Sequence, residues 1–249
     1  MQREPSGKRQ GQPATPVGNP ADRTSGRTLD HAAPVYDILA PLMTLGVETR
    51  CSRDVLEELR LTGGEKVLDV GCGTGKLTRE IAHRLDPEAG SLVIGLDAAM
   101  KMLDVARRKA GNVPNLRFEA AIAEELPYAD GFFDRFVSTF FFHHVNAGLK
   151  RKTLGELWRV LRPGGIGVIV DVDVPYNLFG ALCAWSGYVL FHQDEIRENI
   201  RGELRRAFDA SPFAWHVLRR RAGYITTFVL TKPDTGRGNP SSRKKKERR

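Results

Sequence analysis

Two acids and a run of glycines are the residues best suited to bind a ligand. The apolar run Lys66–Val70 contains Asp69, and a second apolar run ends at Asp97. Between them lies the loop Gly71-Cys72-Gly73-Thr74-Gly75. Glycines let the backbone turn sharply and come close to a ligand, and the next helix presents unpaired N–H groups. A carboxylate at the end of the second run suits the two hydroxyls of a ribose, so this order of elements predicts a site for an adenosine-containing cofactor.

The spacing of the glycines favours S-adenosylmethionine over a dinucleotide. A dinucleotide fingerprint reads G-x-G-x-x-G, but here the third glycine comes one position early and Lys76 occupies the expected place. Asp69 also puts a negative charge beside the loop, which is unfavourable for a pyrophosphate and favourable for an ammonium group. S-adenosylmethionine carries an ammonium, a sulfonium and a single carboxylate, so its charges match the loop.

Strand-like and helix-like segments alternate along the chain. We expect strands at residues 66–70, 92–97, 115–119, 135–138 and 166–172. Helical spacing follows the first strand at Thr78–Leu85, and an amphipathic helix spans Lys150–Leu161 until Arg162-Pro163-Gly164-Gly165 ends it. This alternation predicts a doubly wound α/β sheet with helices on both faces. In that class ligands bind beyond the carboxyl ends of the strands.

Composition limits the class of protein. The chain has 249 residues, of which 41% are hydrophobic, enough for one domain whose core needs no cross-links. Three scattered cysteines do not make a disulfide framework or a zinc site, so we expect a reducing, cytoplasmic location and no metal. No apolar run reaches the roughly 20 residues of a membrane-spanning helix, and the N-terminus lacks the apolar block of a signal peptide.

The net charge of +8 is concentrated at the two ends of the chain. Residues 1–30 carry five Lys/Arg and three Asp/Glu, residues 232–249 carry eight and two, and residues 31–231 have no net charge. We expect disordered basic tails at 1–28 and 233–249, because neither holds enough large apolar side chains to fold. The domain between them, residues 29–232, therefore gives no sign of binding nucleic acid.

The segment from Val67 to Gly75 resembles motif I of the class I S-adenosylmethionine-dependent methyltransferases. The resemblance spans roughly residues 30–232 and is carried by Gly95-Leu96-Asp97, Glu124–Tyr128, Phe133-Asp134, Ser138–Val145 and Arg159–Gly165. It is closest to the type 11 branch, which includes the ubiquinone/menaquinone-biosynthesis C-methyltransferases. It implies a Rossmann-like, seven-stranded sheet whose last strand is antiparallel, with residues 213–219 and 223–231 as the final pair.

The resemblance also implies roles for single residues. Asp69 reaches the cofactor's ammonium, Asp97 holds the ribose, and the glycines form the loop against the methionine and ribose parts. The full set implied for the cofactor site is Asp69, Gly71, Cys72, Gly73, Thr74, Gly75, Asp97, Ala98, Met100, Ile122, Ala123 and Ser138. Ile122 departs from the family pattern, because many members have there an Asp that accepts a hydrogen bond from the adenine amino group. One contact worth about 1 kcal/mol is therefore missing.

Two segments flank the core and are candidates for binding the acceptor. The first runs from Asp30 to Leu61 and contains Tyr36; the second is an insertion after the fifth strand, residues 175–210, and contains Trp185. Both residues are candidate substrate contacts, although such side chains also pack on sheet edges. His143 follows the fourth strand, near the expected methyl group, and is the candidate general base.

The expected reaction is an in-line transfer of a methyl group from S-adenosylmethionine to a small apolar or aromatic molecule of the quinone, lipid or phenol type. A catalytically silent module that only binds the cofactor is the main alternative, in view of Ile122. A nucleic-acid methyltransferase that uses the basic tails is a weaker one. Peripheral contact with a membrane stays open, because the apolar insertion and the basic C-terminal tail would both assist it.

Overall fold

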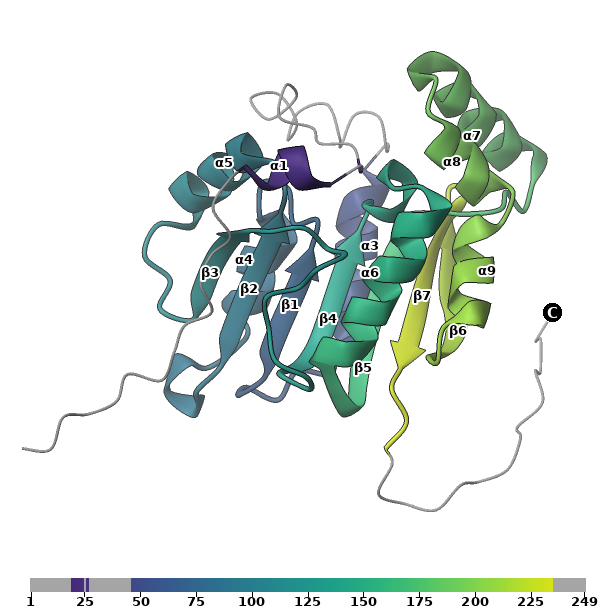
Figure 1. Ribbon diagram of the computed structural model, residues 1–249. Helices are drawn as coiled ribbons and strands as arrows, with labels where there is room; N and C mark the ends of the chain where they lie inside the picture. The colour runs from purple at the N-terminus through teal and green to yellow at the C-terminus, as the bar shows by residue number, and fades with distance from the viewer. Residues whose placement is uncertain (1–18, 25, 27–45, 235–249) are drawn as a thin grey trace, which may run out of the picture.

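The computed structural model describes residues 19–24, 26 and 46–234, and in them one sheet is flanked by helices (Figure 1). The sheet has seven strands in the order β3-β2-β1-β4-β5-β7-β6. The strands are β1 (Lys66–Val70), β2 (Leu92–Asp97), β3 (Leu116–Ala120), β4 (Phe133–Thr139), β5 (Leu161–Val172), β6 (Ala214–Arg221) and β7 (Ile225–Thr231). The helices are α1 (Pro20–Arg23), α3 (Val47–Glu58), α4 (Lys76–Ala82), α5 (Met100–Ala110), α6 (Ala147–Val160), α7 (Leu178–Phe191), α8 (Asp194–Ile200) and α9 (Glu203–Ala210), with 3-10 turns η1 (Pro87–Ala89) and η2 (Phe142–His144).

The direction of the strands confirms the predicted fold class. β1 pairs in parallel with β2 and β4, and β5 continues the parallel part of the sheet. β7 lies between β5 and β6 and is antiparallel to both. The order therefore reverses beside β1, where the loop from Gly71 to Gly75 begins, and this is the switch point at which doubly wound sheets bind ligands.

Side chains of each central strand alternate between two apolar clusters. Leu68, Ile94 and Phe136 belong to the cluster that includes residues of α6 and α9. Their neighbours Val67 and Val93 belong to the cluster that includes residues of α3 and α4. Because successive residues of a strand point to opposite faces, the sheet is buried on both sides, with α6 in front of it and α3 behind it in Figure 1.

The segment expected to be a disordered N-terminal tail, residues 1–28, differs in part from that expectation. Pro20–Arg23 form the short helix α1, in which the Asn19 side chain accepts a hydrogen bond from the Ala21 N–H. Arg23 forms an ion pair of 2.6 Å with Glu125, and the Thr24 hydroxyl donates to Glu124 at 2.7 Å. These contacts lie about 100 residues away along the chain, so the composition of the segment gave no sign of them.

The insertion after the fifth strand, expected at residues 175–210, contains two different parts. α9 packs on α6 and buries Leu204 and Phe208 in the core, so it belongs to the sheet's own helical layer. α7 and α8 lie at the upper right of Figure 1, beyond the carboxyl end of β5, where α8 packs on η2 and α9. No helix among the described residues is both long and apolar enough to cross a membrane.

Candidate cofactor site and active site

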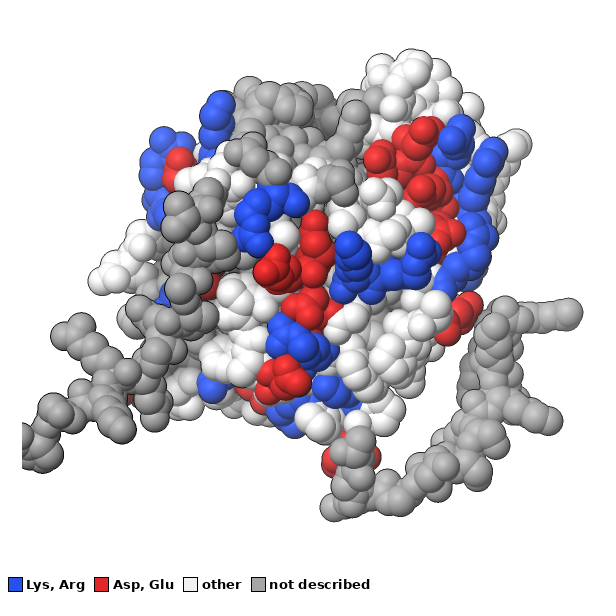
Figure 2. Space-filling model, in the orientation of Figure 1, with Lys and Arg blue, Asp and Glu red and all other residues white. Residues whose placement is uncertain are grey.

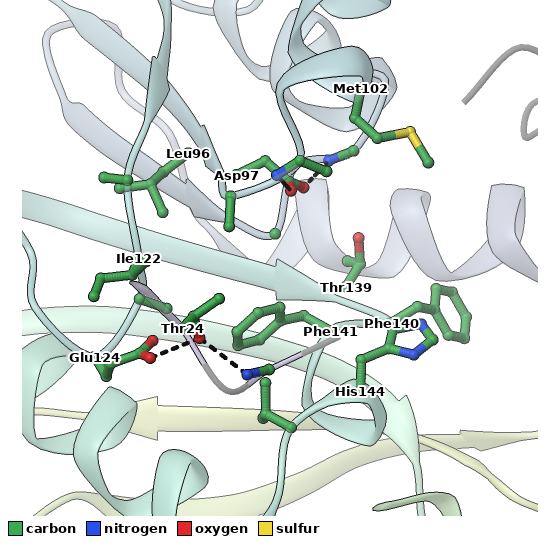
Figure 3. Close-up of a pocket in the computed structure, with 18 residues that line it drawn as sticks. Thr24, Leu96, Asp97, Met102, Ile122, Glu124, Thr139, Phe140, Phe141 and His144 are labelled. Atoms are coloured by element: carbon green, nitrogen blue, oxygen red, sulfur yellow. Dashed lines mark hydrogen bonds between the residues drawn. The ribbon is translucent and has the colours of Figure 1, made fainter. Parts of the chain in front are cut away.

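A pocket opens at the carboxyl ends of β1, β2, β3 and β4 (Figure 3). Its wall combines the glycine loop, the end of β2, the segment after β3 and the segment after β4. The residues that line it are Thr24, Gly26, Gly71, Gly73, Leu96, Asp97, Ala98, Ala99, Met102, Ala121, Ile122, Ala123, Glu124, Thr139, Phe140, Phe141, His144 and Val145. The pocket therefore lies at the switch point of the sheet.

The three glycines of the loop have different surroundings. All have positive φ angles, of 71° at Gly71, 54° at Gly73 and 71° at Gly75. A Cβ at Gly73 would meet no atom within 4 Å, whereas a Cβ at Gly75 would come within 2.5 Å of the Phe118 ring. Gly73 thus leaves open space for a ligand beside the backbone, and Gly75 is required by packing.

Asp97 lies in the pocket wall with a fixed carboxylate. One oxygen accepts a hydrogen bond from the Gly73 N–H and the other from the Ala99 N–H, both at 2.9 Å. The sequence produces this geometry because β2 ends at Asp97, directly opposite the loop that follows β1. These two hydrogen bonds hold the carboxylate of Asp97 in a single orientation in the pocket wall.

Asp69 is buried beneath the loop and only one of its oxygens is satisfied. The Thr78 hydroxyl donates to Oδ2 at 2.6 Å, while Oδ1 has no hydrogen-bond partner among the described residues. Burial, reinforced by the negative charge of Asp97, raises the pKa of Asp69 to about 7. A buried carboxylate with a free oxygen is costly unless a cation approaches it, which is what an ammonium group of a ligand would do.

Six of the residues that the sequence implied for the cofactor line the pocket: Gly71, Gly73, Asp97, Ala98, Ile122 and Ala123. The other six, which are Asp69, Cys72, Thr74, Gly75, Met100 and Ser138, are not part of the lining. Met100 is 42% exposed, and Met102, two positions later on α5, lines the pocket instead. The Ser138 hydroxyl donates to the Val70 carbonyl at 2.9 Å and so links β4 to β1.

Cys72 is a packing residue in this structure. Burial and the nearby carboxylates of Asp97 and Asp69 raise the pKa of its thiol well above the ordinary value. Because the thiolate is the nucleophilic form, the thiol is kept inert.

Sequence reasoning missed the aromatic part of the wall. Phe140 and Phe141 follow β4, and Phe140 has a φ of 56°, a conformation that residues other than glycine seldom adopt. A Cβ at Gly71 would come within 2.6 Å of the Phe141 ring, so the ring packs directly on the loop. The run Phe140-Phe141-Phe142 was the available signal, but a run of three aromatic residues does not show which rings face a pocket.

His143 is held by a buried carboxylate. Its Nδ1 lies 2.8 Å from Oδ1 of Asp171, whose side chain is fully buried at the end of β5. The other oxygen of Asp171 accepts the Phe142 N–H at 2.6 Å. With Asp171 ionised, Nδ1 carries the proton and Nε2 presents a lone pair. The neighbouring His144, rather than His143, is part of the pocket lining.

Of the two candidate substrate residues, Trp185 alone lies in the described part of the chain. Tyr36 lies outside the described residues. Trp185 lies on α7, is 38% exposed, and forms an edge-to-face pair with Tyr188 at 5.8 Å between ring centroids. It is not among the residues that line the pocket.

Comparison with known proteins identifies the family. A family model described as a methyltransferase domain matches residues 67–165. The chain is 36% identical over 192 residues to the uncharacterized methyltransferase sll0829 of Synechocystis, an alignment that covers 75% of this chain and 86% of the relative. This chain belongs to the methyltransferase family. It is also 36% identical over 171 residues to the demethylmenaquinone methyltransferase of Deinococcus radiodurans, covering 67% of this chain and 69% of that one.

The fold of this methyltransferase is also found in a solved structure. The SAM-dependent methyltransferase from Aquifex aeolicus matches with a TM-score of 0.58 at 19% identity, over 82% of this chain and 98% of that one. The cofactor of the methyltransferase is S-adenosylmethionine, and its pocket fits this molecule. Asp97 is fixed where it would hold the ribose hydroxyls, Gly73 leaves room beside the backbone, and the free oxygen of Asp69 would take the ammonium.

Proposed function

We propose that this methyltransferase acts on a small apolar or aromatic molecule of the quinone, lipid or phenol type. The observation that carries the proposal is the apolar wall after β4, where Phe140, Phe141 and Val145 line the pocket. Aromatic rings in a pocket wall favour a flat, apolar ligand. The name of the Deinococcus relative, a demethylmenaquinone methyltransferase, is consistent with such an acceptor.

S-adenosylmethionine supplies the activated methyl group on its sulfonium. The protein's part is to hold donor and acceptor in line and to exclude water, because correct alignment removes most of the entropic barrier of a two-body reaction. The rigid parts of the wall serve this purpose: the loop pinned by Asp97 and the segment after β4, whose Phe140 N–H donates to the Val170 carbonyl at 2.8 Å.

A carbon or phenolic oxygen must lose a proton when it accepts a methyl group, and His143 is our candidate base. The Asp171 carboxylate orients its ring and stabilises the imidazolium that forms after proton transfer. Asp171 itself is a positioning residue, since it is fully buried and reaches the acceptor only through His143.

Ile122 supports one alternative, a protein that binds the cofactor without catalysis. Its side chain lines the pocket. At this position the resemblance to the family implies a carboxylate that accepts a hydrogen bond from the adenine amino group. Turnover separates the two functions. Purified protein is incubated with S-adenosylmethionine and a panel of reduced naphthoquinones, benzoquinones and simple phenols, and S-adenosylhomocysteine is quantified. Release that depends on one class of acceptor supports the proposal, whereas cofactor binding without release on any of them supports the silent module.

We also infer a cytoplasmic location for the protein. Cys51, Cys72 and Cys183 are all free thiols, as expected in a reducing compartment. Microscopy of the tagged chain in its own cells tests this inference, and a signal outside the cytoplasm would contradict it.

A further inference from the structure

The exposed apolar side chains of the described residues are concentrated at one end of the molecule. Nine large apolar residues of the described part of the chain are substantially exposed, and eight of them lie between Val174 and Leu190. These eight, which we call the apolar patch, are Val174, Tyr176, Leu178, Phe179, Leu182, Trp185, Val189 and Leu190. Figure 2 shows this end as an uncharged cap at the upper right, bordered by charged side chains. Such a contiguous patch marks an interaction surface.

The orientation of α7 is the reverse of that of an ordinary surface helix. Its small residues face the protein: Ala184 is 2% exposed, and the backbone of Gly180 packs directly on that of Gly223. Its large residues face outward, with Leu178 87% exposed and Leu182 70% exposed. The helix contains no Asp, Glu, Lys or Arg. An amphipathic helix normally buries its large apolar side chains, so here they are displayed to something outside the chain.

Arginines border the apolar patch. The guanidinium of Arg220 lies 5.7 Å from the centre of the Tyr176 ring, and that of Arg197 lies 5.4 Å from the Tyr188 ring on α7. Arg201 precedes Gly202, which packs against Val174 of the patch. Arg197 forms an ion pair with Asp194 at 2.9 Å. Arg201 and Arg220 are exposed and form no ion pair with a carboxylate in the described part of the chain.

We propose that the apolar patch docks this methyltransferase on a membrane surface that contains anionic lipid. With 14 residues, α7 is about 21 Å long, shorter than the ~30 Å hydrocarbon core, so it suits a position along the interface. Trp185 and Tyr176 are residue types that favour the interface, and the bordering arginines match lipid phosphates. The benefit of docking for the reaction rests on the proposed function, because an apolar acceptor would be dissolved in the same bilayer.

The patch is linked to the walls of the active site through α8. Lys150, which is fully buried on α6, donates to Glu198 of α8 at 3.1 Å and to the carbonyl of Val145, which lines the pocket. Asn199 of α8 donates to the Val172 carbonyl at 3.1 Å, next to Asp171. Docking through α7 would therefore hold the pocket at a fixed position relative to the membrane.

The test measures co-sedimentation of the full chain with phosphatidylcholine vesicles, with and without phosphatidylglycerol. The variant Leu178→Asp/Leu182→Asp adds two charges to the patch at exposed positions that do not support the core. The matched control Asn112→Asp/Ala214→Asp adds two negative charges at exposed positions elsewhere. A third variant, Arg201→Gln/Arg220→Gln, removes the basic border. Binding of S-adenosylmethionine is measured by calorimetry for each protein.

We expect the wild type and the matched control to bind, with higher affinity for the anionic vesicles. The patch variant should lose at least about tenfold in affinity for both kinds of vesicle, because it lacks two leucine side chains that the bound wild type would bury in the bilayer. The arginine variant should lose affinity for the anionic vesicles only, by about fivefold or more.

Equal binding by the wild type and the patch variant overturns the proposal, as does no binding by the wild type. A wild-type dimer that the patch substitutions convert to a monomer also overturns it, because a second copy then covers the patch. Cofactor binding that persists while vesicle binding is lost separates failure of docking from failure of the methyltransferase site.

Discussion

Thr78 donates a hydrogen bond of 2.6 Å to one oxygen of Asp69, and the other oxygen of this buried carboxylate has no partner in the part of the chain that the structure describes. The site is therefore arranged for a charge that the described residues do not provide. The pKa of Asp69, raised by burial to about 7, has consequences for both stability and cofactor binding.

The first consequence is a stability of the cofactor-free protein that falls with increasing pH. The folded-state pKa of Asp69 lies above the value of 3.8 expected in the unfolded chain, so the folded state holds the proton more tightly. The contribution is complete below about pH 4 and is lost as the pH rises through about 7. Thermal unfolding between about pH 4 and pH 7 should show a steeper decline for the wild type than for Asp69→Asn. Parallel curves for the two proteins would contradict the assignment, and Asp104→Asn, at an exposed position on α5, is the control.

The second consequence is that affinity for S-adenosylmethionine rises with pH through the same range. The cofactor's ammonium requires the ionised form of Asp69, which becomes more populated near and above pH 7. Asp69→Asn should weaken binding about tenfold or more and remove this pH dependence. Calorimetric titrations at several pH values measure both effects. A wild-type affinity that is independent of pH would contradict the assignment of Asp69 to the ammonium of the cofactor.

Ile122 offers a gain of affinity. Replacement by Asp supplies the acceptor that the family resemblance implies for the adenine amino group, and one such hydrogen bond is worth about 1 kcal/mol, or about fivefold in affinity. Ile122→Val, which changes only the size of the side chain, should leave cofactor affinity nearly unchanged. Weaker binding by Ile122→Asp would show that the adenine does not lie against this part of the wall.

Alanine substitutions at two positions of the glycine loop should have different effects. In Gly73→Ala the new methyl group enters open space beside the backbone, so cofactor affinity should fall, and folding stability should lose only the strain of alanine at a φ of 54°, about 1–2 kcal/mol at most. In Gly75→Ala the methyl group collides with the Phe118 ring, and such overpacking costs about 1–3 kcal/mol of folding stability. Denaturant titration and calorimetry on both variants separate the two effects. Similar losses of stability at both positions would contradict the distinction.

His143 and Asp171 should be separated by kinetics once an acceptor is found. His143→Gln should lower kcat by about a hundredfold or more without changing affinity for S-adenosylmethionine. Asp171→Asn should lower kcat less and shift the pH profile, because the ring of His143 loses the carboxylate that orients it. A normal kcat and pH profile in both variants would assign this pair to the stability of η2 alone.

The sequence predicted the sheet well because its signals are local. The run from Leu92 to Asp97 is uninterrupted and apolar, and β2 has the same bounds. Asp97 was found for the same reason, since it ends that strand. The position of α1 could not be predicted, because it depends on Arg23 and Thr24 contacting residues about 100 positions away. Met100 was implied by the family resemblance, but Met102 lines the pocket and Met100 is 42% exposed, because residues two positions apart lie on different sides of α5.

The most direct test of the central claim is calorimetric titration of S-adenosylmethionine and S-adenosylhomocysteine into the wild type and Asp97→Ala, with Asp104→Ala as the control at an exposed acid on α5. Asp97 has its carboxylate fixed by Gly73 and Ala99 in the pocket wall, so its removal should cost two charged hydrogen bonds to the ribose, at least about a hundredfold in affinity. The account predicts binding by the wild type and the control and this loss in Asp97→Ala. Undiminished binding by Asp97→Ala, with the protein still folded, would contradict it.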